Sequence, residues 1–176
     1  KTAIYRRYGN PKDIIELADE EVRSPAEGEV VIEIEAAPIH LGDLYNMEGR
    51  EGFRLPLPMV PGIEGIGRII EIDSTVTAFK VSDRVLFLSS SHVDNFIVNQ
   101  QGTWREQITL SSEILIPAPE GDAAQYANIV NPATAYVFIH DVTKPERGEW
   151  IIQNAANSNV GRYLIKIANH YGIKLI

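Results

Sequence analysis

Residues 149–176 read as a strand, a loop of small residues, a helix and a second strand. Glu149-Trp150-Ile151-Ile152-Gln153 is a short apolar strand pattern, and residues 160–171 place apolar side chains at helical spacing. Gly172 follows as the expected C-cap, and residues 173–176 begin another strand. Since two parallel strands need a crossover between them, this order predicts a β–α–β unit.

The loop inside this unit is a candidate phosphate-binding turn. A helix N-terminus offers unpaired N–H groups and a partial positive charge, so a pyrophosphate can bind where nearby side chains are small. Against the dinucleotide-binding pattern G-x-G-x-x-G, the glycine positions hold Ala156, Ser158 and Gly161, so only the last glycine remains. The pattern alone leaves open an ordinary strand-to-helix turn of an α/β protein. The candidate cofactor-binding residues are Asn154, Ala155, Ala156, Asn157, Ser158, Asn159, Val160 and Gly161.

The first two-thirds of the chain is rich in strand patterns. Strands are predicted at residues 30–36, 67–73, 84–88 and 104–110, with turn-forming residues between them, which is typical of a small barrel or sandwich. Residues 41–47 favour one or two helical turns. After Pro119 the pattern becomes helical at 122–129 and again from Asn131 to residue 142, with Pro132 at or near the first helical position.

Composition narrows the possible functions. The chain has no cysteine, which removes disulfides, thiol catalysis and the usual soft zinc ligands. Its 16 Lys and Arg against 24 Asp and Glu give a net charge of -8, a poor basis for binding nucleic acid. No apolar stretch is long enough to span a membrane, and the first residues lack the apolar core of a signal peptide. A cytoplasmic protein acting on a small molecule is expected.

Five motifs, in order along the chain, resemble the medium-chain dehydrogenase/reductase family, especially its zinc-free quinone oxidoreductases and 2-enoyl thioester reductases. They are residues 61–67 (PGIEGIG), 81–85 (VSDRV), 102–105 (GTWR), 131–136 (NPATAY) and 152–161 (IQNAANSNVG). The resemblance implies a β-rich GroES-like barrel over residues 1–121. It implies that residues 122–176 are the truncated first β–α–β unit of an α/β Rossmann domain. It further implies a homodimer and, for these 176 residues alone, no activity.

The same resemblance implies a nicotinamide cofactor. Asn131 and Thr134 match family positions beside the nicotinamide. NADPH is favoured over NADH by analogy only, because the residues that choose between them normally lie about 20 residues beyond the loop, past Ile176.

Zinc is not expected. Zinc-dependent relatives have Cys-His-x-Asp where this chain has His40-Leu41-Gly42-Asp43, and Gly-His-Glu where it has Gly62-Ile63-Glu64. Ile63 cannot bind zinc, and His40 with Glu64 does not complete the three protein ligands of a catalytic site.

Without a metal, hydride addition to a quinone or to an alkene conjugated to a carbonyl is the expected reaction, since hydrogen-bond donors can hold the enolate charge. The tyrosine of enoyl thioester reductases is replaced here by Glu51. The resemblance implies Tyr45 and His40 as candidate catalytic residues, because quinone-oxidoreductase-like members have a tyrosine at the position of Tyr45 and zinc-free relatives often have an asparagine at that of His40. A purely structural role for each is the alternative. Asp43 and Trp104 are assigned to the substrate cleft, and Arg105 to a pairing with Asp43 or Glu64 or to a substrate phosphate.

Two alternatives remain open at this point. The first is a catalytically weak nucleotide-binding sensor or scaffold of the same fold. The second is a barrel module without any enzymatic role.

Overall fold

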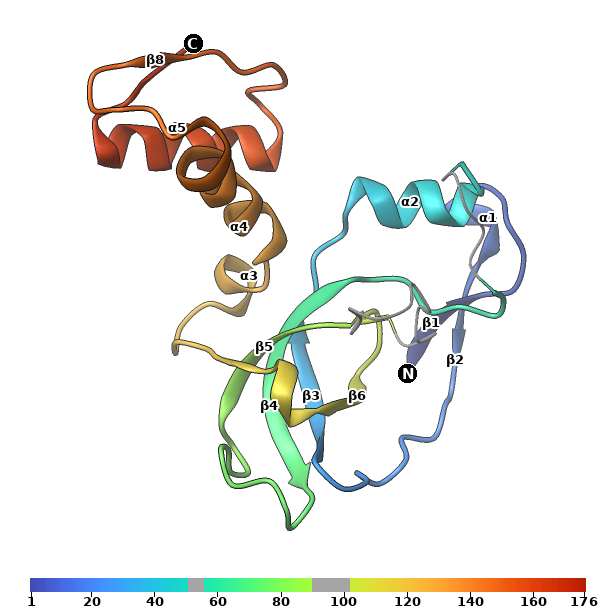
Figure 1. The fold of residues 1–176 in the computed structure, drawn as a ribbon. Coiled ribbons are helices and arrows are strands. Elements are labelled where there is room, and N and C mark those ends of the chain that lie inside the picture. Colours follow the sequence, from blue (N-terminus) through green and yellow to red (C-terminus); the bar gives the residue numbers. More distant parts are fainter. Residues whose placement is uncertain (51–55, 90–101) are drawn as a thin grey trace. The chain divides into compact units, whose positions relative to one another are not determined.

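The computed structural model describes residues 1–50, 56–89 and 102–176 (Figure 1). The chain forms two compact units, Lys1–Ala127 and Asn128–Ile176. The sequence places the boundary earlier, after residue 121. The difference comes from the short helix α3 (Ala123–Tyr126), which contacts the sheet of the first unit.

The first unit is built on a five-stranded antiparallel sheet in the order β6-β3-β4-β5-β7. The strands are β3 (Glu29–Ala36), β4 (Glu64–Ile72), β5 (Arg84–Leu88), β6 (Gln107–Ser111) and β7 (Ile116–Pro117), with a single 3-10 turn, η1 (Ser112–Ile114), before the last. Alternating side chains such as Val30, Ile32 and Ile69 form its core with Val85 and Phe87. The four predicted strands are confirmed, but β6 begins at Gln107 and not at Trp104.

A second small sheet at the N-terminus was not predicted. Strands β1 (Thr2–Tyr5) and β2 (Ile15–Ala18) pair antiparallel, joined through one helical turn, α1 (Pro11–Ile14). Single bridges tie Thr2 to Arg105 and Tyr5 to Met59. Each of these elements is only four residues long, so no local periodicity marks them.

The helix α2 (Leu41–Glu48) confirms the prediction for residues 41–47 and ends at Gly49, which takes the left-handed conformation. Its Met47 packs in a second buried cluster with Tyr5, Ile14 and Met59. This cluster joins the C-terminal half of the helix to the N-terminal strands.

The second unit contains a β–α–β element. Strands β8 (Trp150–Ile151) and β9 (Lys174–Leu175) pair in parallel, with α5 (Asn159–Tyr171) between them and the C-cap Gly172 in the left-handed region, as predicted. Before them, α4 (Val130–Val137) continues into a π-helical segment, η2 (Phe138–Thr143). Pro132 lies at the third position of α4, where its missing N–H is still one of the unpaired first-turn groups.

The core of this unit lies between α4 and α5, where Ala135, Ile139, Leu164, Ala168 and Ile173 are buried. None of the helices in the described part of the chain is long and apolar enough to cross a membrane.

Candidate functional site

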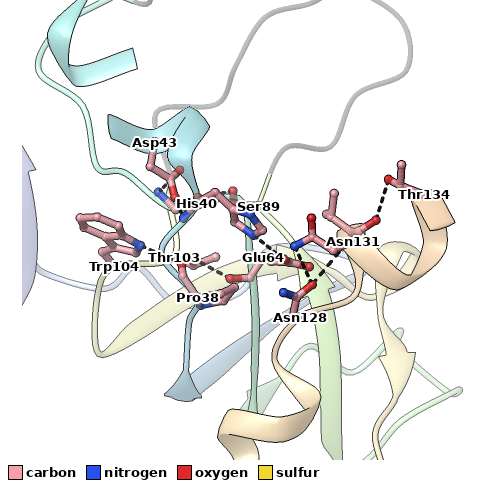
Figure 2. Close-up of polar contacts among 12 residues, drawn as sticks. Pro38, His40, Asp43, Glu64, Ser89, Thr103, Trp104, Asn128, Asn131 and Thr134 are labelled. Atoms are coloured by element: carbon pink, nitrogen blue, oxygen red, sulfur yellow. Dashed lines mark hydrogen bonds and ion pairs between the residues drawn. The ribbon is translucent and has the colours of Figure 1, made fainter. Parts of the chain in front are cut away.

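The first unit holds a buried histidine–carboxylate pair. His40 precedes α2 and Glu64 begins β4, and His40 Nε2 lies 2.5 Å from Glu64 Oε1 (Figure 2). The Glu64 side chain is fully buried and that of His40 is 14% exposed. A carboxylate in this environment accepts the Nε2–H, which fixes the imidazole ring and occupies one of its two nitrogens.

Asp43 holds the backbone on both sides of this pair. Its Oδ2 accepts the N–H of His40 at 2.8 Å, and its Oδ1 accepts the N–H of Gly62 at 3.2 Å. Burial raises the pKa of the Asp43 carboxyl, against the lowering effect of these hydrogen bonds and of the neighbouring His40. Both oxygens are committed to backbone groups, so Asp43 is a positioning residue and a poor general base.

The turn at Gly62 needs a glycine. Its φ is 99°, and a Cβ there would lie 2.3 Å from Thr103 Oγ1 and 2.5 Å from Trp104 Cδ1. Ser89 Oγ donates to the Gly62 carbonyl at 2.7 Å, and Thr103 Oγ1 donates to the Glu64 carbonyl at 2.9 Å (Figure 2). Sequence reasoning missed both hydroxyls, because serine and threonine near a strand end carry no distinctive pattern.

Trp104 packs beside the second buried cluster, and its indole Nε1 donates to the Pro38 carbonyl at 3.3 Å. The guanidinium of Arg105 donates to the Gly102 carbonyl at 3.0 Å and lies 3.8 Å from Glu20. The predicted pairing of Arg105 with Asp43 or Glu64 is therefore wrong. The reason is the bridge from Arg105 to Thr2, which places it beside the N-terminal segment.

Tyr45 lies half-buried on α2, and the Arg50 guanidinium stands over its ring at 4.8 Å from the centroid. Within the described residues its hydroxyl has no hydrogen-bond partner. The structure does not connect Tyr45 to His40. Glu51, which stands where enoyl thioester reductases have a tyrosine, lies outside the described residues.

The described residues around His40 do not supply three ligands for a catalytic zinc ion. Among the described residues, no group of three His, Asp or Glu side chains is placed to share a metal. His40 and Glu64 are hydrogen-bonded to each other rather than converging on a common point, and Ile63 stands at the remaining ligand position of the family pattern.

The second unit carries the predicted phosphate loop in a form that suits a phosphate. Ser158 caps α5 by accepting the Gly161 N–H at 3.1 Å, and the Arg162 N–H donates to the Ser158 carbonyl at 2.9 Å. A Cβ on Gly161 would lie 2.7 Å from the Ala155 carbonyl oxygen, so this glycine is required.

The rest of the loop is open. Residues 154–159 are exposed, and the backbone N–H groups of Asn159 and Val160 have no acceptor in the described part of the chain. Small side chains beside two free N–H groups at a helix N-terminus are the elements that a dinucleotide phosphate needs.

Asn131 and Thr134 lie on α4 and use their side chains within the helix. Thr134 Oγ1 donates to the Val130 carbonyl at 2.8 Å, and Asn131 Nδ2 donates to Asn128 Oδ1 at 3.1 Å (Figure 2). Asn128 also accepts the Asn131 backbone N–H at 3.3 Å. Asn128 was missed, although an asparagine two residues before a helix that accepts a first-turn N–H is a recognisable capping signal.

Comparison with known proteins agrees with these features. The sequence model of the alcohol dehydrogenase GroES-like domain matches residues 26–120. The mitochondrial enoyl-[acyl-carrier-protein] reductase of Rattus norvegicus is 34% identical over 178 residues, a match that covers 100% of this chain and 45% of the relative. The chain thus spans about half the length of the curated relatives it matches.

Solved structures match over nearly the whole chain. A Bacillus thuringiensis protein assigned as an NADPH:quinone reductase superposes with a TM-score of 0.86 at 26% identity, covering 99% of this chain and 50% of its own. The Etr1p/NADP/crotonyl-CoA complex superposes with a TM-score of 0.79 at 26% identity, covering 99% and 52%. With its GroES-like domain and the β–α–β unit that follows, the chain belongs to the medium-chain dehydrogenase/reductase family.

Proposed function

We propose that the protein is an NAD(P)H-dependent oxidoreductase that transfers a hydride to a quinone or to an α,β-unsaturated carbonyl compound such as an enoyl thioester. The observation that carries the proposal is the open, serine-capped loop 154–161 between parallel strands, which suits a dinucleotide phosphate. NADPH is preferred to NADH, because the similar solved complexes bind NADP or are named for NADPH. Enoyl thioesters and quinones are the acceptors because relatives at 26–34% identity are named for them.

In this proposal the loop holds the cofactor phosphates. The N–H groups of Asn159 and Val160 bind phosphate oxygens at the N-terminus of α5, where the helix dipole favours negative charge. The phosphates can reach these N–H groups because the side chains of Ala155, Ala156 and Ser158 are small. The nicotinamide would lie beside Asn131 and Thr134. When bound, the cofactor supplies the hydride, and the protein supplies position and electrostatics.

The first unit would stabilise the enolate that develops on the substrate. Tyr45 and His40 are the candidate donors. Since Glu64 takes the Nε2–H, His40 would donate to the substrate from Nδ1 and only as an imidazolium, with Asp43 fixing the backbone that carries it. Removal of one preorganised donor of this kind by mutation lowers kcat roughly 100-fold to 1,000-fold. The proposal uses no zinc, since the His40–Glu64 pair and Ile63 do not form a ligand set.

A second candidate is a nucleotide-binding sensor or scaffold with little catalysis. Two observations favour it. The His40 ring is already hydrogen-bonded to Glu64, and Glu51 stands where enoyl thioester reductases have a tyrosine.

One assay separates the two. The full-length protein is mixed with NADPH or NADH, and the cofactor absorbance is followed with a quinone and with a trans-2-enoyl thioester. Oxidation of the cofactor by either acceptor supports the reductase. Tight NADPH binding without oxidation supports the sensor, and no binding of either cofactor rejects both. A homodimer is proposed on family resemblance alone, and light scattering after size-exclusion chromatography tests it.

A further inference from the structure

A cavity of about 420 Å³ lies in the second unit, at the end of α5 opposite to the phosphate loop. His140, Lys144, Arg147 and Tyr171 line it over a floor that includes Ile173. The proposed function uses none of these residues. The volume lies within the range of small-molecule sites, which combine apolar walls with a few placed polar groups.

The two cations in the wall are not neutralised. Neither Lys144 nor Arg147 forms an ion pair with any carboxylate among the described residues. The neighbouring Glu149 carboxylate instead accepts the backbone N–H of Glu146 at 2.7 Å. In a chain with a net charge of -8, two free cations beside one cavity favour an anionic ligand.

The backbone that presents Lys144 is strained. Lys144 has φ 46° and ψ 48°, the left-handed conformation, although it is neither glycine nor asparagine and it precedes Pro145. It closes a π-helical segment, and its N–H bonds the Ile139 carbonyl at 2.9 Å. π-Helical turns and strained residues occur frequently at binding sites, where the strain is retained for function.

Arg147 is positioned by the end of α5. Its side chain crosses Gly172, where an added Cβ would lie 3.1 Å from Arg147 Nε. The Gly148 N–H also bonds the Gly172 carbonyl at 2.9 Å, which anchors the segment that carries Arg147. The exposed Arg147 side chain therefore starts from a backbone segment that is tied to the end of α5.

His140 and Tyr171 contribute aromatic rings to a wall that also includes Ile139 and Pro145. The His140 ring lies 4.0 Å from the Tyr136 ring and meets the Tyr171 ring edge-on at 4.7 Å. His140 Nε2 is buried, with no hydrogen-bond partner in the described part of the chain. A buried polar atom of this kind is normally satisfied by a water or a ligand.

We propose that this cavity binds a small organic anion. Arg147 and Lys144 hold its phosphate or carboxylate group, and its apolar body lies against Tyr171 and Ile173. Arginine offers the paired donors that match either oxyanion, so the two groups share the same chemistry here.

Isothermal titration of the full-length protein with phenyl phosphate and with benzoate tests the site. We expect Arg147→Gln and Lys144→Asn each to weaken binding of the preferred probe about tenfold or more, the loss of one charged hydrogen bond. Lys174→Gln removes a cation of the same unit that lies on Trp150 outside the cavity, and it should leave binding unchanged. Tighter binding of phenyl phosphate identifies a phosphate ligand, and tighter binding of benzoate a carboxylate.

Lys144→Asn keeps the test independent of folding. Asparagine adopts the left-handed conformation more readily than lysine, so the variant should melt at the same or a higher temperature while it loses the anion. Equal binding by the wild type and all three variants would place the anion elsewhere, for example at the phosphate loop, and overturn the proposal. Absence of binding by both probes at millimolar concentration would also overturn it.

Discussion

At the scale of single residues, the polar groups of the candidate site in the first unit are hydrogen-bonded to one another. Glu64 fixes the His40 ring, and Asp43 fixes two backbone N–H groups. The sequence identified His40, Asp43 and Tyr45 through family motifs. It did not indicate that His40 and Glu64 are bonded, because 24 residues and a change of strand separate them.

Replacement of Tyr45 by Phe tests whether its hydroxyl reaches the substrate. We expect kcat to fall about 100-fold with NADPH binding unchanged, because only a donor to the developing enolate is lost. Tyr8→Phe, a nearby ring of the second cluster, is the control and should retain its rate. An unaltered kcat in the Tyr45 variant would remove this residue from the mechanism.

Replacement of His40 by Leu should lower the free energy of unfolding by about 2 kcal/mol, since a fully buried carboxylate loses a charged hydrogen bond. The double variant His40→Leu, Glu64→Leu should recover much of that stability, because it removes the buried charge as well. Urea unfolding of the three proteins measures this, and a double variant less stable than the single one would contradict it.

Ionisation of the buried Tyr5 phenol is expected to lower the stability of the fold at high pH. Burial raises its pKa from 10.0 to about 12, so its folded-state pKa exceeds the unfolded one. The neutral phenol therefore stabilises the fold fully below pH 10, and this contribution is lost between about pH 10 and 12. Melting temperatures across that window should fall more steeply for the wild type than for Tyr5→Phe, and parallel slopes would reject this assignment.

At the scale of elements, hydrophobic periodicity predicted the helices and strands that are long or have clear capping residues. The helix α5 was predicted from its apolar spacing and Gly172, and the strands β3, β4 and β5 from β-branched runs. The strands β1 and β2 were missed because each has only four residues, and β1 is also held by distant partners such as Met59. The π-helical segment η2 was read as a plain continuation of α4, since its sequence keeps helical spacing.

Replacement of Gly161 tests the close packing of the phosphate loop against α5. Gly161→Ala places a methyl group 2.7 Å from the Ala155 carbonyl oxygen, so we expect a loss of about 1–3 kcal/mol in stability and weaker NADPH binding. Gly42→Ala, in the first turn of α2, meets no atom within 4 Å and should be neutral or stabilising. Thermal unfolding with and without NADPH measures both, and equal behaviour of the two variants would contradict the close packing.

At the scale of the whole molecule, the family motifs identified the order of the two units better than local patterns did. Five motifs spread along the chain implied a GroES-like domain followed by a β–α–β unit, and both are present. Their boundary was less predictable, because α3 looks like any short helix until its contacts with β3 and β4 are known.

The 176 residues alone are predicted to show no turnover with NADPH and a quinone or enoyl thioester. Two strands and one helix cannot bury both faces of a sheet, and Trp150, Ile152 and Ile176 are 62%, 84% and 67% exposed. The full-length protein assayed in parallel is the control. Measurable turnover by the 176-residue chain would show that this view of the two units is incorrect.

The pairing of β3 with β4 on one side and β6 on the other sets an order of events during synthesis. Glu29 at the start of β3 pairs with Ser111, so the sheet cannot be completed until most of the first unit has left the ribosome. The second unit makes its contacts within a short stretch of chain, which is the arrangement that forms quickly. The slow, exposed stage of folding therefore belongs to β1, whose start waits for partners more than a hundred residues away at Arg105 and Glu106.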